Sequence, residues 1–121
     1  MPKILVIDDD PDIRTVLDIL LKKQGHLVET ASREDEVFNK VSQFQPDIIL
    51  LDVLLSGADG RAVCQRLKAE KATSHIPVIM FSGHPGAAGK IDAYGADDFI
   101  SKPVNTDTLI TKIQSHLKLS H

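Results

Sequence analysis

Residues 47–52 read Asp-Ile-Ile-Leu-Leu-Asp, an unbroken apolar run between two carboxylates. Four consecutive large aliphatic side chains leave no polar face, which is typical of a central parallel strand that is covered on both sides. The run stops at Asp52. This stretch therefore predicts a buried strand that carries a carboxylate at its carboxyl end.

Three other apolar runs also stop at polar residues. The stops are, in chain order, Asp8-Asp9 after residues 4–7, Ser82 after residues 76–81, and Ser101-Lys102 after Phe99-Ile100. Parallel strands place their carboxyl ends at one edge of a sheet, which is the edge where open α/β sheets bind ligands. We therefore expect three carboxylates, a hydroxyl and an ammonium to converge there.

Strand-like runs alternate with helix-like periodicity five times along the chain. The predicted strands are residues 3–8, 27–30, 47–52, 76–82 and 98–101. The first predicted helix is capped by Asp10, has Pro11 in its first turn and is ended by Gly25; its apolar positions are Ile13, Val16, Leu17, Leu20 and Leu21. The second is capped by Ser32 and closed by Pro46. The other three are a helix around 63–67, a short one at 88–94 and one over 106–118. This pattern predicts an α/β fold, a doubly wound, flavodoxin-like five-stranded parallel sheet with order 2-1-3-4-5 and five helices on two faces.

Composition limits the classes of protein that fit. A chain of 121 residues with 42% hydrophobic and 26% charged residues suits one domain, residues 1–121. The net charge of -3 and the lack of a basic run argue against direct nucleic-acid binding. No apolar run approaches the roughly 20 residues that span a bilayer, so we expect no membrane contact and a cytoplasmic location. The single cysteine, Cys64, is expected to be a buried helix residue.

The predicted convergence of Asp8, Asp9 and Asp52 requires a chemical explanation. Like charges a few ångströms apart raise one another's pKa, so such a cluster favours a bound cation. Mg²⁺ is bound in proteins by one or two carboxylates together with waters and phosphate oxygens. A carboxylate can also attack phosphorus to form an aspartyl phosphate, around which Lys102 and Ser82 could neutralise charge.

These residues resemble the receiver domain of two-component response regulators, of the single-domain, chemotaxis-regulator-like kind. The matching motifs follow the family's order and cover essentially the whole chain: residues 4–13, residues 47–52, Asp59-Gly60, Ser82, residues 95–98 and residues 101–103. The resemblance implies a phosphorylation-dependent signalling switch that accepts a phosphoryl group from a sensor histidine kinase or a histidine phosphotransfer protein and acts on an unknown downstream protein. It implies catalysis of the protein's own phosphorylation and dephosphorylation only, without turnover of a separate substrate.

The resemblance also implies a role for each site residue. Asp52 is the expected phosphoacceptor, with Lys102 and Ser82 assisting catalysis, and Ser82 and Phe99 are the expected switch residues. The expected Mg²⁺ ligands are Asp9, Asp52 and the backbone carbonyl of Leu54, with Asp8 acting through water. A cis Lys102-Pro103 bond is expected as well.

Each residue taken alone has a plainer interpretation, and three other functions fit the sequence less well. Alone, Asp8 or Asp52 is a turn or capping residue, Lys102 a solvated strand end, Ser82 a turn former and Phe99 a core residue. An aspartate-nucleophile phosphatase of the haloacid dehalogenase type would carry a second aspartate two residues on, where this chain has Leu54. A nucleotide-binding module would need a phosphate-binding loop, and residues 83–90 do not have the spacing of one. A flavodoxin-like binder of flavin mononucleotide would have the same strand order. In this chain, however, the acids would lie at the cofactor's phosphate site and would repel the phosphate.

The chain departs from the common receiver pattern in two places. Leu55-Ser56 replaces the usual Met-Pro after the phosphoacceptor, which removes a fixed φ, and segment 83–94 is about half a helical turn short. Leu54 and His84 occupy positions that tune dephosphorylation in the family. We expect apolar Leu54 to shield an acyl phosphate from water, so that an unchanged phosphate lifetime in Leu54→Asn would contradict this role.

The output of the switch is not encoded in any motif. No effector motif follows residue 118, which favours a stand-alone receiver, although a receiver cut from a hybrid kinase or a DNA-binding regulator would look the same.

Overall fold

The computed structural model describes residues 2–55, 58–83, 95–102 and 104–119. Its elements follow in chain order: β1 (Lys3–Ile7), α1 (Pro11–Lys23), β2 (Leu27–Ala31), α2 (Glu34–Phe44), β3 (Ile48–Asp52), β4 (Leu54–Leu55), β5 (Ala58–Asp59), α3 (Gly60–Ala69), β6 (Val78–Ser82), β7 (Asp98–Ser101) and α5 (Thr106–Leu119). The expected short helix at 88–94 lies outside the described residues.

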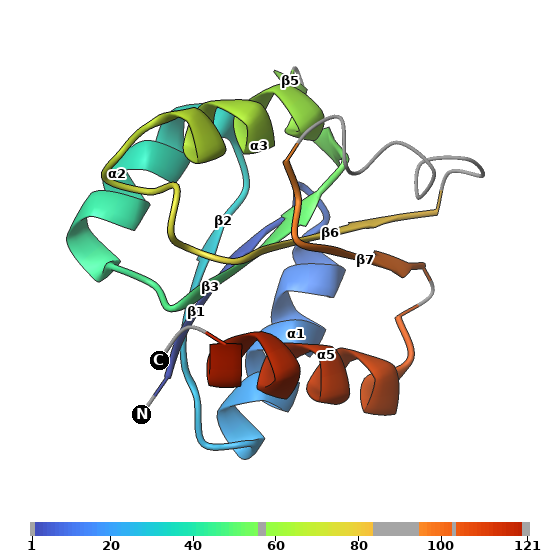
Figure 1. Ribbon diagram of the computed structural model, residues 1–121. Coiled ribbons are helices and arrows are strands. Elements are labelled where there is room, and N and C mark those ends of the chain that lie inside the picture. Colours follow the sequence, from blue (N-terminus) through green and yellow to red (C-terminus); the bar gives the residue numbers. More distant parts are fainter. Residues whose placement is uncertain (1, 56–57, 84–94, 103, 120–121) are drawn as a thin grey trace.

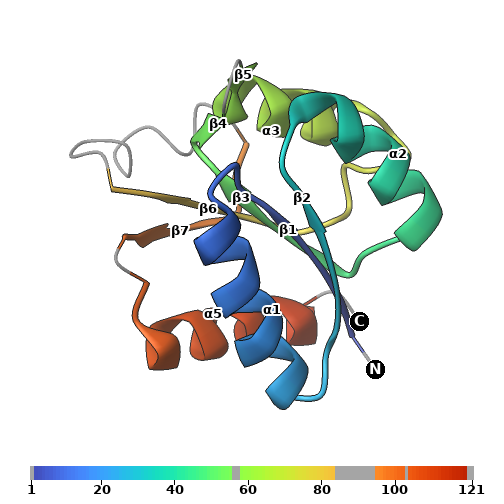
Figure 2. The ribbon, with the colours of Figure 1, turned by 180° about the vertical axis from the view of Figure 1, so that it is seen from behind.

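Five strands form one parallel sheet in the order β2-β1-β3-β6-β7. In chain order of these five strands, this is the predicted arrangement 2-1-3-4-5. Helices α1 and α5 cover one face, and α2 and α3 cover the other (Figures 1 and 2). The switch point of this order lies between β1 and β3, because the chain runs outward from there in both directions.

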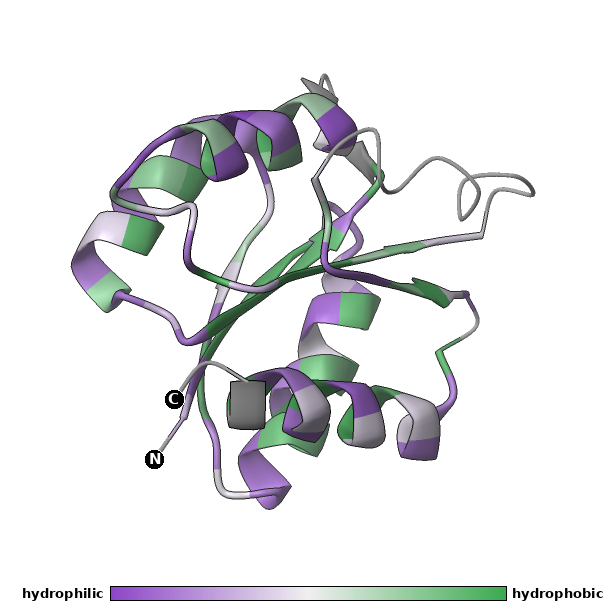
Figure 3. Cartoon of the chain, viewed as in Figure 1, coloured by the Kyte–Doolittle hydropathy of each residue, from purple (hydrophilic) through white to green (hydrophobic). Residues whose placement is uncertain are grey.

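The sheet divides the core into two apolar clusters. Leu5, Ile7, Ile49 and Leu51 point toward α2 and α3. The alternate residues Ile4, Val6, Ile48 and Leu50 point toward α1 and α5. Strand β3 is buried at every residue, as the run at 47–52 predicted, and Figure 3 shows the apolar strands between helices whose outer surfaces are hydrophilic.

Local features explain where α1 begins and ends. The Asp10 side chain accepts the N–H of Asp12, Pro11 fills the first helical position, and Gly25 follows the helix with a φ of 89°. These three features were predicted from the sequence. Val16, which the helical pattern assigned to the apolar positions, is instead 61% exposed.

The prediction that Ser32 caps the second helix was wrong by one residue. Arg33 is the N-cap of α2, and Ser32 precedes it. The Glu36 carboxylate accepts the hydroxyl of Ser32 and the N–H groups of Ser32 and Arg33, so the serine hydroxyl acts as a donor to Glu36. The helix ends at Phe44, and its C-cap Gln45 is a left-handed residue directly before Pro46.

Two other elements differ in detail from the expected pattern. Strand β6 begins at Val78 and not at residue 76, because Pro77 has no N–H and the N–H of Ile76 bonds to Thr73. The turn-rich stretch after β3 contains the two-residue antiparallel pair β4 and β5. Cys64 is buried in α3, and burial raises the pKa of its thiol to about 11, so it is an unreactive core residue.

Candidate functional site

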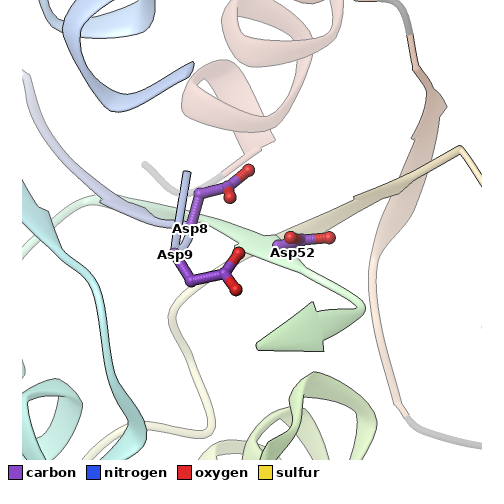
Figure 4. Close-up of side chains that lie close together, drawn as sticks. All are labelled: Asp8, Asp9 and Asp52. Atoms are coloured by element: carbon purple, nitrogen blue, oxygen red, sulfur yellow. The ribbon is translucent and has the colours of Figure 1, made fainter. Parts of the chain in front are cut away.

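The ends of β1 and β3 bring three carboxylates together. Ile7 pairs with Leu51 in the sheet, so Asp8 and Asp52 follow at the same level on neighbouring strands. Ligand oxygens of Asp8, Asp9 and Asp52 all lie within 4.8 Å of one another. Asp8 and Asp52 are buried and Asp9 is exposed, and Figure 4 shows the three side chains grouped where the two strands end.

Lys102 supplies the positive charge of this cluster. It directly follows β7, and its N–H donates to the Ser82 carbonyl, which fixes it beside the end of β6. Its Nζ lies 3.1 Å from Asp8 Oδ2 and 3.3 Å from Asp52 Oδ2. Partial burial lowers the pKa of Lys102, but the negative charges of Asp52 and Asp8 outweigh this effect, so the pKa is raised and the side chain is an ammonium.

Asp8 and Asp9 differ in how many of their carboxylate oxygens already accept hydrogen bonds. Asp8 Oδ1 accepts the N–H of Asp10 at 2.9 Å, and Asp8 Oδ2 accepts from Lys102. Among the described residues, the Asp9 side chain accepts no hydrogen bond and faces solvent. Asp9 is therefore free to ligate a cation directly, whereas a cation would reach Asp8 more readily through water.

The donor set fits a hard divalent cation. All side-chain ligands are carboxylate oxygens, and one ammonium leaves an excess of two negative charges in the cluster. Mg²⁺ prefers oxygen ligands and retains waters, which suits a site with one exposed and two buried carboxylates. Leu54 lies in β4, two residues beyond Asp52, so its backbone is at the same end of the sheet.

The sequence and the fold are similar to those of known proteins. The sequence profile described as the response regulator receiver domain matches residues 4–114. The chain belongs to the response regulator receiver domain family. It is 37% identical to the DNA-binding dual master transcriptional regulator RpaA of Synechocystis over 120 residues, covering 98% of this chain and 50% of RpaA. It is 36% identical to the transcriptional regulatory protein AfsQ1 of Streptomyces coelicolor, covering 52% of that protein. The chain thus spans about half the length of the curated relatives it matches.

Solved structures agree with the family assignment. A putative response regulator from Chloroflexus aurantiacus is 28% identical and superposes with a TM-score of 0.91 over 98% of this chain and 99% of its own. The receiver domain of NtrX from Brucella abortus is 34% identical, with a TM-score of 0.87 over 95% and 98% of the two chains. The function of the chain is that of a receiver domain of a two-component response regulator, and the expected resemblance is confirmed.

Gly60 holds the receiver's third helix against the site. Its N–H donates to the Val53 carbonyl at 2.7 Å, and a Cβ at this position would lie 1.9 Å from the Asp52 carbonyl oxygen. Only glycine allows this approach of α3 to the end of β3. The Asp59 side chain caps α3 by accepting the N–H of Arg61, which completes the Asp59-Gly60 motif seen in the sequence.

The predicted switch residues lie on β6, which is next to β3, and on the edge strand β7. Ser82 ends β6 and is buried, and it pairs in register with Ser101 of β7. Phe99 is partly buried and packs against the apolar cluster on the α2 and α3 side. Asp98 accepts the N–H of Phe99 at 2.8 Å, and Lys112 of α5 donates to the Phe99 carbonyl at 2.9 Å.

Sequence reasoning missed one residue near the receiver site. Arg14 of α1 donates from Nη1 to the Asp8 carbonyl at 2.8 Å. The sequence carries only part of the signal: a helical side chain leans toward the N-terminus of its helix, so an arginine near the start of α1 can reach toward the preceding strand end, but the packing of α1 on the sheet decides whether it does. The Leu54 side chain, His84 and Pro103 lie outside what the structure describes, and so does the expected cis Lys102-Pro103 bond.

Proposed function

We propose that this receiver is phosphorylated on Asp52. We propose further that Mg²⁺ is held by Asp9, Asp52 and the Leu54 carbonyl, and by Asp8 through water. The main supporting observation is the Lys102 ammonium, which lies 3.3 Å from a buried carboxylate in a cluster with excess negative charge. Bound Mg²⁺ would neutralise charge on the carboxylates and on the incoming phosphoryl oxygens.

The transfer step follows from the chemistry of the acceptor. An Asp52 oxygen forms a bond to phosphorus while the bond from phosphorus to the donor's histidine nitrogen breaks, and the electron pair stays on the imidazole, which then takes up a proton. Lys102 would remain paired with the new phosphoryl oxygens, because it already faces Asp52. Both Asp8 oxygens accept hydrogen bonds, which suits a supporting role for this carboxylate.

The donor we propose is a phosphohistidine on a sensor histidine kinase or a histidine phosphotransfer protein. A hollow of about 290 Å³ beside Lys102 is lined mainly by apolar side chains of α1 and by Val104, including the exposed Val16. An apolar surface next to the acceptor suits a protein that must bring its histidine to Asp52. We propose that the donor protein covers this hollow during transfer.

We propose that the output is a conformational change and that the chain turns over no separate substrate. Ser82 would move toward the phosphoryl group, and Phe99 would rotate into the space released. The downstream partner is a protein, since the net charge of -3 offers no field for nucleic acid. RpaA is described as DNA-binding, and half of its length lies beyond the match. A chain that is part of such a regulator would signal through its further domain.

We propose the cytoplasm as the place of action, because an ATP-dependent kinase must supply the phosphohistidine. Among the residues that the structure describes, no helix is long and apolar enough to cross a bilayer.

Phosphorylation by acetyl phosphate and Mg²⁺ tests the acceptor. Intact-protein mass spectrometry should show one added phosphoryl group on the wild type and none on Asp52→Asn. Asp47→Asn is a matched control, because Asp47 precedes the same strand at the opposite edge of the sheet and bonds to the Lys3 amide. Equal phosphorylation of wild type and Asp52→Asn would refute the assignment.

A further inference from the structure

Arg14 contacts the chain on both sides of Asp9. Its guanidinium donates to the Asp8 carbonyl at 2.8 Å, and its own N–H donates to the Asp10 carbonyl at 3.1 Å. Within the described part of the chain, no carboxylate lies within ion-pair distance of Arg14. The one side-chain hydrogen bond of this partly buried arginine is therefore made to the backbone of the acidic cluster.

Asp9 depends on its backbone for its position. Asp8 is fixed through its carboxylate, which binds both Lys102 and the N–H of Asp10. The exposed Asp9 side chain has no such contact with described residues. The carbonyl that Arg14 holds belongs to the peptide joining Asp8 to Asp9, so it sets the direction in which Asp9 leaves the strand.

We propose that Arg14 is a positioning residue for the Mg²⁺ ligand Asp9. This inference rests on the metal site in the proposed function and deepens it, because it explains how an otherwise unheld carboxylate stays beside Asp52. Ligating carboxylates are commonly fixed by surrounding hydrogen bonds, and here the hydrogen bond acts on the adjacent peptide. Arginine suits the task, because its long side chain can lean back over the first turn of α1 and donate from a rigid fork.

Charge and position make opposite predictions for the loss of Arg14. A cation close to three carboxylates weakens their attraction for Mg²⁺, so an effect of charge alone predicts tighter binding when the arginine is removed. A positioning role predicts weaker binding, since Asp9 would no longer be held toward the cluster. The sign of the change in affinity therefore separates the two roles.

Titration of the full chain with Mg²⁺ tests the proposal. Isothermal calorimetry measures the affinity, and NMR monitors the amide signals of the site. We expect Arg14→Met and Arg14→Gln to weaken Mg²⁺ binding by about tenfold and to broaden or shift the Asp9 amide signal. Lys22→Met on the same helix is the control, because Lys22 pairs with Asp18 and contacts none of the three carboxylates. Its affinity should match that of the wild type. Denaturant unfolding of each variant shows whether it is folded.

Two results would overturn the inference, and they are distinguishable. Wild-type or tighter Mg²⁺ affinity in either folded Arg14 variant would refute the positioning role and leave the metal site intact. A wild-type chain that binds no Mg²⁺ would refute the metal site and the role of Arg14 with it.

Discussion

Gly60 shows how one residue can set the backbone geometry around Asp52, the proposed phosphoacceptor. Replacing it with alanine would place a methyl group 1.9 Å from the Asp52 carbonyl oxygen, so the backbone of β3 or α3 must move. We expect Gly60→Ala to lower the free energy of unfolding by about 1–3 kcal/mol, the usual cost of overpacking, and to slow phosphorylation of Asp52. Urea unfolding and acetyl phosphate labelling measure the two effects.

Gly25→Ala is a suitable control for that change. Gly25 has a φ of 89°, but a Cβ added to it would meet no atom within 4 Å, so alanine there strains the backbone without a clash. We expect a loss of stability of about 1 kcal/mol with unchanged labelling of Asp52. If Gly60→Ala left the rate of labelling unchanged, Gly60 would matter only for stability.

Asp98 joins β7 to α5 and makes this contact dependent on pH. Burial alone would raise the pKa of Asp98, but hydrogen bonds from Lys112 at 2.6 Å and His116 at 2.9 Å outweigh it, so the pKa lies below the ordinary value of 3.8. A lowered pKa means that the stabilisation is complete above this ordinary value and is lost as the pH falls through the lower folded-state value.

Asp98→Asn should therefore be destabilised by about 1–2 kcal/mol at pH 7, since it loses two charge-assisted hydrogen bonds. The difference from the wild type should shrink at pH 3 and below. Chemical unfolding of both proteins at the two pH values measures this. A difference of equal size at both values would show that the carboxylate charge of Asp98 is not what stabilises the contact.

Helix α1 offers a paired test of donor docking. Val16 and Ile19 are both exposed on this helix, but only Val16 lines the hollow beside Lys102. We expect Val16→Asn to slow phosphotransfer from a cognate kinase by about tenfold, or about 1.4 kcal/mol, while labelling by acetyl phosphate stays unchanged. Ile19→Asn serves as the control for the loss of one exposed apolar residue from the helix. Equal slowing in both variants would place the docking surface elsewhere.

The stability of the whole molecule should depend on the cation. Without Mg²⁺, three carboxylates face one ammonium, and folding must bring these like charges together. Added Mg²⁺ that binds only the folded chain should raise the midpoint of thermal unfolding with increasing concentration, and a chelator should reverse the effect.

Asp9→Asn separates repulsion from metal binding. We expect this variant to unfold at a higher temperature than the metal-free wild type, because one repelling charge is gone, and to gain little from Mg²⁺. A wild-type response to Mg²⁺ in Asp9→Asn would show that Asp9 is not a ligand.

The sequence was most informative where one physical cause dominates. The four aliphatic residues before Asp52 can only be satisfied in a sheet covered on both faces, and parallel pairing then places Asp8, Asp52 and Lys102 at one edge. Features that depend on tertiary distances were not predictable in this way. The bond from Arg14 to the Asp8 carbonyl depends on how α1 sits on the sheet, which the helical period does not specify.

The predictions that differed from the structure concern single residues or very short segments. The helical period does not decide whether a residue at the border of the apolar face, such as Val16, is covered by a neighbour. Ser32 and Arg33 are adjacent possible caps, and the choice between them follows from the contacts of Glu36. Strands β4 and β5 have two residues each, too few for any periodicity.

The hydrogen bonds that hold the Phe99 backbone affect how fast the switch could act. Asp98 and Lys112 already hold the N–H and the carbonyl of Phe99, so its main chain has little freedom to shift. Reorientation of Phe99 would then be a change in side-chain rotamer populations, which needs no break in the sheet and can be far faster than a domain motion. Aromatic side-chain relaxation, more than backbone amide shifts of β7, is where such a signal would register.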